Sequence, residues 1–138
     1  MLSEKPEHKG QTFVCSHLND DSFVPDGHRK WFDYRDFGIA AATQGLCQAH
    51  VVRANSPSKK GGLGWHKHVL DLQFVYVLKG WQTMEIEGHG VITMKEGSAW
   101  IQPPSIMHNV LEYSDDFEAL ELLCPAHFDT VDDDHFQS

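Results

Sequence analysis

Two histidines separated by a single residue, His66 and His68, are the residues best suited to chemistry in this sequence. In a β-strand the side chains of residues i and i+2 point to the same face, so both imidazoles would project into one space. Neutral imidazole is a good ligand for zinc, copper, iron and nickel. The pair therefore indicates a divalent metal site; the alternative is a pair of solvated loop histidines, because His-x-His also arises by chance.

The pair is part of a longer spacing pattern that extends over residues 61–112. The residues that define this pattern are His66, His68, Gln73, Gly80, Gly97, Pro103 and His108. Their spacing resembles the cupin family, whose motifs are G-x5-HxH-x(3,4)-E-x6-G and G-x5-PxG-xx-H-xxx-N. The joint spacing of two motifs is much more specific than an isolated His-x-His.

The resemblance implies an all-β fold, the cupin-type antiparallel β-barrel (a double-stranded β-helix or jelly roll). It also implies that a divalent transition metal, Fe, Zn, Ni or Mn, is bound by His66, His68, His108 and Gln73. For His108 the alternative is a hydrogen-bonded histidine in the mouth of the barrel. For Gln73 the alternative is a buried amide bonded to the barrel backbone.

The sequence departs from the family pattern at several motif positions. Gln73 replaces the motif glutamate, with Asp71 two residues earlier, Ser105 replaces a glycine, Glu112 replaces the closing asparagine, and the leading glycine is one residue off. Three neutral imidazoles and a neutral amide would leave the charge of the ion uncompensated. Such a metal favours an anionic substrate as its next ligand. No strong general base is evident in the sequence.

Charge and cysteine usage restrict the class of protein. The chain has 138 residues, with 11 Lys and Arg against 20 Asp and Glu and a net charge of −9, which argues against binding to nucleic acid or an anionic membrane. No segment approaches the roughly 20 apolar residues of a membrane span, and the first residues do not resemble a signal peptide. The odd cysteine count and the absence of a CxxC pair predict three free thiols in a cytoplasmic protein, Cys15, Cys47 and Cys124.

Short apolar runs separated by turn residues begin at residue 46 and continue to residue 124. Their spacing and their content of Val, Ile, Phe, Tyr and Trp predict an antiparallel barrel or sandwich. The predicted strands are 46–54, 74–78, 81–86, 91–94, 99–102, 107–113 and 117–124. Alternation predicts that Val75 and Val77 share the face of Gln73, with Phe74 and Tyr76 on the opposite face.

Other residues are predicted to have smaller roles in the site. His50 is interpreted as a structural residue or as a partner of the metal ligands. The remaining histidines lie in arm, turn or tail segments and are expected to be solvated: His8, His17, His28, His89, His127 and His135. The candidates for the pocket wall are Arg53, Tyr76, Met84, Ile101 and Met107. The acidic end of the chain is expected to be a solvated tail.

The predicted organisation is an N-terminal arm over residues 1–30 and a single cupin domain over residues 31–138. The arm is polar with short apolar patches, and it cannot bury them by itself. Open sheet edges also need cover. Because cupins commonly dimerise through N-terminal segments, we expect a homodimer to which residues 13–24 contribute.

The resemblance implies a metal-dependent enzyme, dioxygenase-like, that acts on a small oxygen-rich or aromatic molecule. Two alternatives remain open at this point: a non-catalytic module that binds or senses a small molecule, and a cupin isomerase. Fold alone does not determine function. The absence of an evident general base favours the non-catalytic binding module.

Overall fold

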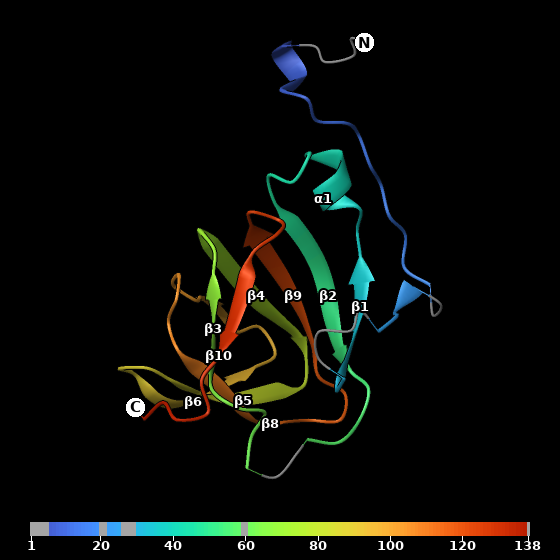
Figure 1. Ribbon diagram of the computed structural model, residues 1–138. Helices are drawn as coiled ribbons and strands as arrows, with labels where there is room; N and C mark the ends of the chain where they lie inside the picture. The colour runs from blue at the N-terminus through green and yellow to red at the C-terminus, as the bar shows by residue number, and fades with distance from the viewer. Residues whose placement is uncertain (1–5, 20–21, 26–29, 59–60, 138) are drawn as a thin grey trace.

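Two five-stranded antiparallel sheets form the protein, and they face each other across the core (Figure 1). The computed structural model describes residues 6–19, 22–25, 30–58 and 61–137. Sheet A contains, in spatial order, β1 (Phe32–Asp36), β2 (Gln48–Ala54), β9 (Glu118–Cys124), β4 (Leu72–Lys79) and β7 (Ala99–Ile101). Sheet B contains β10 (Asp129–Asp132), β3 (His66–Val69), β8 (His108–Tyr113), β5 (Trp81–Ile86) and β6 (Gly90–Lys95).

Among the described residues, two short helical elements have defined bounds. They are a 3-10 turn, η1 (Pro6–His8), and a single-turn helix, α1 (Ile39–Ala42). The all-β prediction is therefore confirmed, and the apolar runs predicted from residue 46 onward correspond to β2 and β4–β9.

Alternation along the strands places one side chain in two against the core. In β5 the buried residues are Gln82, Met84 and Ile86, and the residues between them are only partly buried. In β4 the residues Gln73 and Val75 are buried, whereas Tyr76 is 39% exposed. The predicted assignment of faces in β4 is correct. A strand in one of two facing sheets presents one face to the core between the sheets and the other to solvent.

An aromatic cluster fills one end of the space between the sheets. The Phe32 and Tyr113 ring centroids lie 5.1 Å apart, and Phe117 lies 6.4 Å from each of them. Phe117 is 1% exposed, and it packs with buried aliphatic residues from both sheets. Such ring pairs contribute about 0.5–1.5 kcal/mol beyond the area that they bury. Phe32 and Phe117 of this cluster also line the pocket described below.

Two motif positions show why the spacing pattern contains glycine. Gly80 has φ 68°, and a Cβ added there would overlap the Ser114 hydroxyl and approach Asp116 Oδ1 to 2.6 Å. Ser105, which replaces a motif glycine, has φ 63° and thus lies in the left-handed region. That region costs a non-glycine residue free energy.

A short strand lies near the end of the chain and includes the first residue of its acidic run, Asp132. Asp129–Asp132 pairs antiparallel with the strand that carries His66 and His68, in register with all four of its residues. The acidic residues Asp132, Asp133 and Asp134 are exposed, as expected of a solvated tail. The strand itself was not predicted, because DTVD lacks an apolar alternation and its pairing depends on a distant partner. In Figure 1 this strand, β10, lies beside β3.

The N-terminal segment runs along the outside of the molecule and beyond α1 (Figure 1). The Thr12 amide donates a hydrogen bond to the Ala42 carbonyl at 2.9 Å, and Val24 makes an isolated bridge to Tyr34. Phe13 is 94% exposed. Parts of the predicted arm, residues 1–5, 20–21 and 26–29 with His28 among them, lie outside the described residues.

Candidate metal centre

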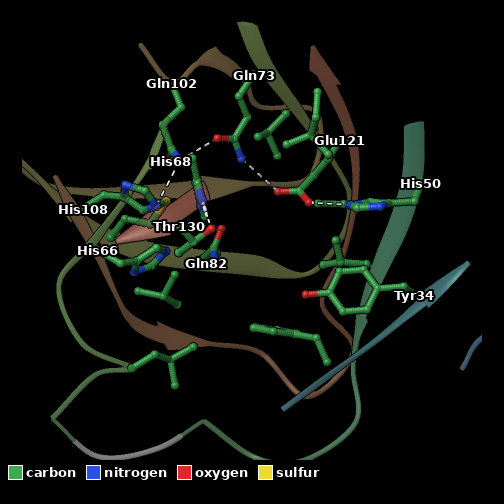
Figure 2. A pocket seen from close by; sticks show the side chains of 18 of the residues that line it. Tyr34, His50, His66, His68, Gln73, Gln82, Gln102, His108, Glu121 and Thr130 are labelled. Atoms are coloured by element: carbon green, nitrogen blue, oxygen red, sulfur yellow. Dashed lines mark hydrogen bonds and ion pairs between the residues drawn. The ribbon is translucent and has the colours of Figure 1, made fainter. Parts of the chain in front are cut away.

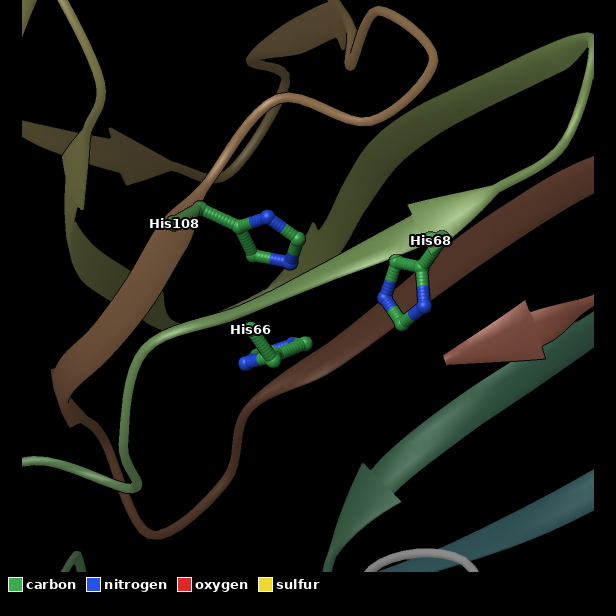
Figure 3. Close-up of side chains that lie close together, drawn as sticks. All are labelled: His66, His68 and His108. Carbon is green, nitrogen blue, oxygen red and sulfur yellow. The ribbon is translucent and has the colours of Figure 1, made fainter. Parts of the chain in front are cut away.

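Three histidines from two neighbouring strands converge on one point. His66 and His68 lie on β3, His108 begins β8, and the register pairs His66 directly with His108. One ring nitrogen from each of the three lies within 4.8 Å of the other two (Figure 3). The three histidines are named below as the triad.

Hydrogen bonds fix the outer nitrogen of each triad ring. The Nδ1 atoms of His66 and His108 lie 3.0 Å from the carbonyl oxygens of Gly64 and Ile106, two residues earlier in the chain. Because a carbonyl oxygen only accepts, each Nδ1 carries the proton and donates it. In the neutral ring the lone pair then resides on Nε2, which is the state of a metal-binding imidazole. The Nδ1 of His68 lies 2.8 Å from a threonine hydroxyl of β10.

Strand β10 therefore contributes to the site as well as to the sheet. Thr130 pairs with His68 and supplies the hydroxyl bonded to its Nδ1, while Asp132 pairs with His66. Both β10 residues line the pocket. His127 also lines it, although its side chain is exposed as the sequence predicts.

The triad fits a divalent transition metal. Imidazole nitrogens about 2.0–2.1 Å from an ion are separated from one another by roughly 3–3.5 Å. The nitrogens here lie within 4.8 Å of one another, so small ring rotations suffice to reach that separation. Two of the three rings are almost completely buried, with His66 5% and His108 2% exposed. Their burial and their outward-bonded Nδ1 atoms limit the reorganisation that metal binding requires.

Gln73 faces the triad from sheet A and is 3% exposed (Figure 2). Its Oε1 accepts a hydrogen bond from Gln102 Nε2 at 3.1 Å, and its Nε2 donates to Glu121 Oε2 at 3.3 Å. Its side chain is thus bonded to two other side chains of the pocket. Because an amide oxygen has two lone pairs, Oε1 can accept this bond and still coordinate an ion.

Glu121 is a carboxylate in the pocket that the sequence analysis did not identify. Its Oε1 accepts a hydrogen bond from His50 Nε2 at 2.7 Å, and its side chain is 21% exposed. Burial raises the pKa of this carboxyl, but the hydrogen bond and charge of His50, with smaller contributions from His68 and Gln73, lower the pKa overall. Glu121 therefore holds its negative charge a short distance from the triad, on the far side of Gln73.

Strand parity contains the signal for Glu121. In β9 the buried residues Ala119 and Leu123 alternate with outward ones, and Glu121 occupies the same face. A carboxylate in the inward register of an otherwise apolar strand has no solvent to face, so it needs a partner. His50 supplies that partner, and its Nε2 is bonded to Glu121 rather than to one of the predicted metal ligands.

A pocket of about 460 Å³ contains all of these groups. Its size is in the range of small-molecule sites. Its remaining walls are mostly apolar and include Phe32, Val52, Leu63, Val75, Met84, Trp100, Val110, Phe117 and Phe128. Of the predicted wall residues, Met84 lines the pocket. Tyr76 and Ile101 are instead 39% and 54% exposed on the outer side of sheet A.

Comparison with known proteins identifies the fold. The sequence matches no protein-family model and no curated protein. In structure the chain is similar to KdgF from Halomonas sp., with a TM-score of 0.62 and 20% identity over 84% of this chain and 96% of that one. It is also similar to the polyketide cyclase RemF from Streptomyces resistomycificus, with a TM-score of 0.65 and 14% identity over 91% of this chain and 88% of that one.

A third similar structure is the oxalate decarboxylase of Bacillus subtilis, described with Mn(II) centres. Its TM-score is 0.57 at 16% identity, over 79% of this chain and 29% of that one. These neighbours are cupin-fold proteins, and this chain shares their fold of two facing antiparallel sheets. The chain therefore has the cupin fold. Among the described residues, no helix has the length and apolar character needed to cross a bilayer.

Proposed function

We propose that this cupin domain is a metal-dependent enzyme that acts on a small oxygen-rich or aromatic molecule. The observation that carries the proposal is the triad, whose Nδ1 atoms are bonded outward while its inner nitrogens converge within a pocket of about 460 Å³. His66, His68 and His108 would bind the metal, and Gln73 Oε1 is the proposed fourth ligand. The metal would be Fe, Zn, Ni or Mn.

The chemistry divides between the ion and the chain. A bound divalent metal would act as a Lewis acid that polarises a substrate oxygen. Glu121, held ionised by His50, supplies an acceptor for a substrate proton. No such general base was evident from the sequence. The apolar walls keep water away from the reacting groups. A metal beside a carboxylate favours isomerase-type chemistry, in which a proton moves next to a polarised carbonyl.

A dioxygenase-type reaction is the second candidate function, and the pocket walls favour it. Phe32, Trp100, Phe117 and Phe128 line the pocket and suit a planar aromatic substrate. A catechol-like diol offers two adjacent oxygens for two open positions on a metal. The non-catalytic binding module is distinguished from both enzymes by recovery of its ligand unchanged.

One experiment distinguishes the three candidate functions: isomerase, dioxygenase and non-catalytic binding module. Untagged protein is analysed for metal, then incubated without oxygen in D2O with small α-hydroxy ketones and diketo acids, and finally given O2 and a catechol. Isomerase-type chemistry predicts deuterium at the carbon next to the carbonyl, lost in Glu121→Gln and retained in the matched control Glu118→Gln. Consumption of O2 in step with loss of the catechol would establish the dioxygenase instead. Full recovery of every probe would leave only the binding module.

We also propose that the protein forms a homodimer through its N-terminal segment. Phe13 and Leu18 are 94% and 68% exposed on a segment that runs along the outside of the domain. Large apolar side chains in this state are typical of a surface that a second copy covers. Deletion of residues 1–28, and separately Phe13→Asp with Leu18→Asp, should halve the mass in light scattering. An unchanged mass in both variants would exclude this segment as the dimer contact.

The other proposed partner is the small-molecule substrate. Binding to nucleic acid or to an anionic membrane is not expected of a chain with a net charge of −9. The cytoplasmic location stays a prediction of the sequence.

A further inference from the structure

Gln102 is a buried amide whose position links the two sheets across the pocket. It follows β7 directly, is 4% exposed, and its backbone amide donates to the Gln73 carbonyl at 2.9 Å. Its side-chain Nε2 lies 3.1 Å from Gln73 Oε1 and 3.0 Å from His108 Nε2. One amide nitrogen thus contacts both the proposed fourth ligand and a histidine of the triad (Figure 2).

The direction of these hydrogen bonds is set at the far end of the chain of amides. An ionised Glu121 only accepts, so Gln73 must turn its NH2 group toward it. Gln73 Oε1 then faces Gln102 and requires a donor, which can only be the Gln102 NH2 group. The second N–H of that group is directed at His108. Reversing either amide would set oxygen against oxygen.

The Gln102 N–H and a metal ion require the same lone pair of His108. His108 Nδ1 donates to a backbone carbonyl, so Nε2 holds the lone pair that accepts the Gln102 hydrogen bond. An ion bound by the triad would take this lone pair. The Gln102 N–H would then keep its place beside the ion, and it would need a new acceptor because a buried unpaired donor is costly.

We propose that Gln102 is a positioning residue that donates this N–H to an anionic oxygen of the ligand held at the triad. The inference rests on the proposed metal site and adds the class of group that the site selects, a carboxylate or enolate oxygen. A donor fixed in a buried pocket stabilises negative charge on oxygen without reorganisation. A neutral oxygen gains less from the same donor, because hydrogen bonds to charged groups are stronger.

The proposal predicts that replacing Gln102 changes two affinities in opposite directions. In Gln102→Leu, Co2+ should bind about tenfold more tightly, because no N–H competes for the His108 lone pair. Acetate should bind to the Co2+-loaded variant about tenfold more weakly, because its oxygen loses the donor. Acetamide, the neutral counterpart, should change less than threefold. Chelator competition measures the first affinity, and the visible absorption of Co2+ measures the other two.

Two further variants make the test decisive. Gln102→Glu, similar in shape, places an acceptor where the donor stood and should abolish acetate binding while it retains Co2+. Gln82→Leu removes another buried glutamine of the same pocket, one outside the chain of amides, and should change both affinities less than threefold. Circular dichroism tests whether each variant is folded. If Gln102→Leu does not fold, acetate binding by Gln102→Glu tests the donor role of Gln102.

The outcomes separate this inference from the proposed function. If the wild-type protein does not bind Co2+, the metal site itself is wrong and the inference falls with it. If the wild type binds Co2+ but both affinities weaken together in Gln102→Leu, Gln102 is only structural. The inference is also overturned if acetate and acetamide respond alike.

Discussion

The pocket has two walls, and they handle charge differently. The wall from sheet B presents three imidazoles, each hydrogen-bonded through Nδ1 and each able to turn Nε2 toward a cation. The wall from sheet A presents an ion pair, His50 with Glu121, and separates it from the triad by the amide of Gln73. The sheet B wall would acquire a positive charge by binding a cation. The sheet A wall already contains the carboxylate of Glu121, which is bonded to His50.

The walls also differ in how the chain builds them. Two of the triad histidines lie two residues apart, and the third pairs directly with one of them. The sheet A wall joins residues from β2, β4 and β9, with His50 and Glu121 adjacent only through strand pairing. A compact motif therefore encodes one wall, and the topology of the sheet encodes the other. The predictions below test whether the walls act separately.

The largest effect is expected from the sheet B wall. The double substitution His66→Ala with His68→Ala removes two of the three convergent nitrogens, and metal affinity should fall by on the order of 100-fold or more. His89→Ala, an exposed histidine in the turn between β5 and β6, is the matched control and should leave affinity unchanged. Elemental analysis after dialysis measures both. Equal metal content in wild type and double variant would place the metal elsewhere.

A substitution in the sheet A wall should affect stability more than metal binding. Glu121→Leu leaves the donors on His50 and Gln73 without their acceptor, and the free energy of unfolding should fall by about 1–3 kcal/mol. Glu118→Leu breaks the more exposed pair with Lys79, 3.6 Å apart, and should cost less than about 1 kcal/mol. Urea denaturation measures both. If Glu121→Leu instead abolished metal binding while stability stayed constant, the walls would not be separable.

Gln73 lies between the walls, so its variants should show both behaviours. Gln73→Glu brings a carboxylate toward the ion and should tighten metal binding about tenfold, although it places like charges side by side next to Glu121. The metal-free variant should therefore melt at a lower temperature than wild type, and added metal should restore it. Gln73→Leu should weaken metal binding modestly. Chelator competition and thermal unfolding test the pair, and unchanged affinity in both would make Gln73 purely structural.

The smallest effect concerns the backbone beside the sheet B wall. The Ser105 amide donates to the His68 carbonyl at 2.9 Å, and Ser105 itself has φ 63°. Ser105→Gly should raise the free energy of unfolding by about 0.5 kcal/mol, since glycine adopts this region without steric cost. Ser98→Gly should act in the opposite direction, because the Ser98 hydroxyl accepts a bond from the Lys95 amide at 3.0 Å. A loss of stability in Ser105→Gly would show that its side chain stabilises the turn.

The sequence allowed most of the fold and one wall of the pocket to be predicted. Alternation assigned β4 correctly, with Val75 facing the core and Tyr76 facing solvent. The two motifs brought the triad residues and Gln73 to one pocket. Both inferences use short-range spacing, which the period of a strand determines directly.

The remainder depends on pairings between distant parts of the chain. β10 has no apolar alternation, so only its register with β3 reveals it. Ile101 was expected in the pocket wall, but it lies on a three-residue strand at the edge of sheet A and is 54% exposed. Glu121 and His50 each fit their strands individually, and their partnership emerges only from the β2–β9 pairing.

The short acidic strand β10 has a further consequence, for the behaviour of the protein in concentrated solution. It forms an outer edge of sheet B, where unpaired backbone groups can recruit the edge of another molecule. Its exposed carboxylates at Asp129 and Asp132, on a chain with a net charge of −9, would repel the same edge of a second copy. That repulsion reaches about 10 Å at 0.1 M salt and about 3 Å at 1 M. The strand that pairs with the strand of His66 and His68 thus also keeps the molecules apart, and high salt weakens this protection against aggregation.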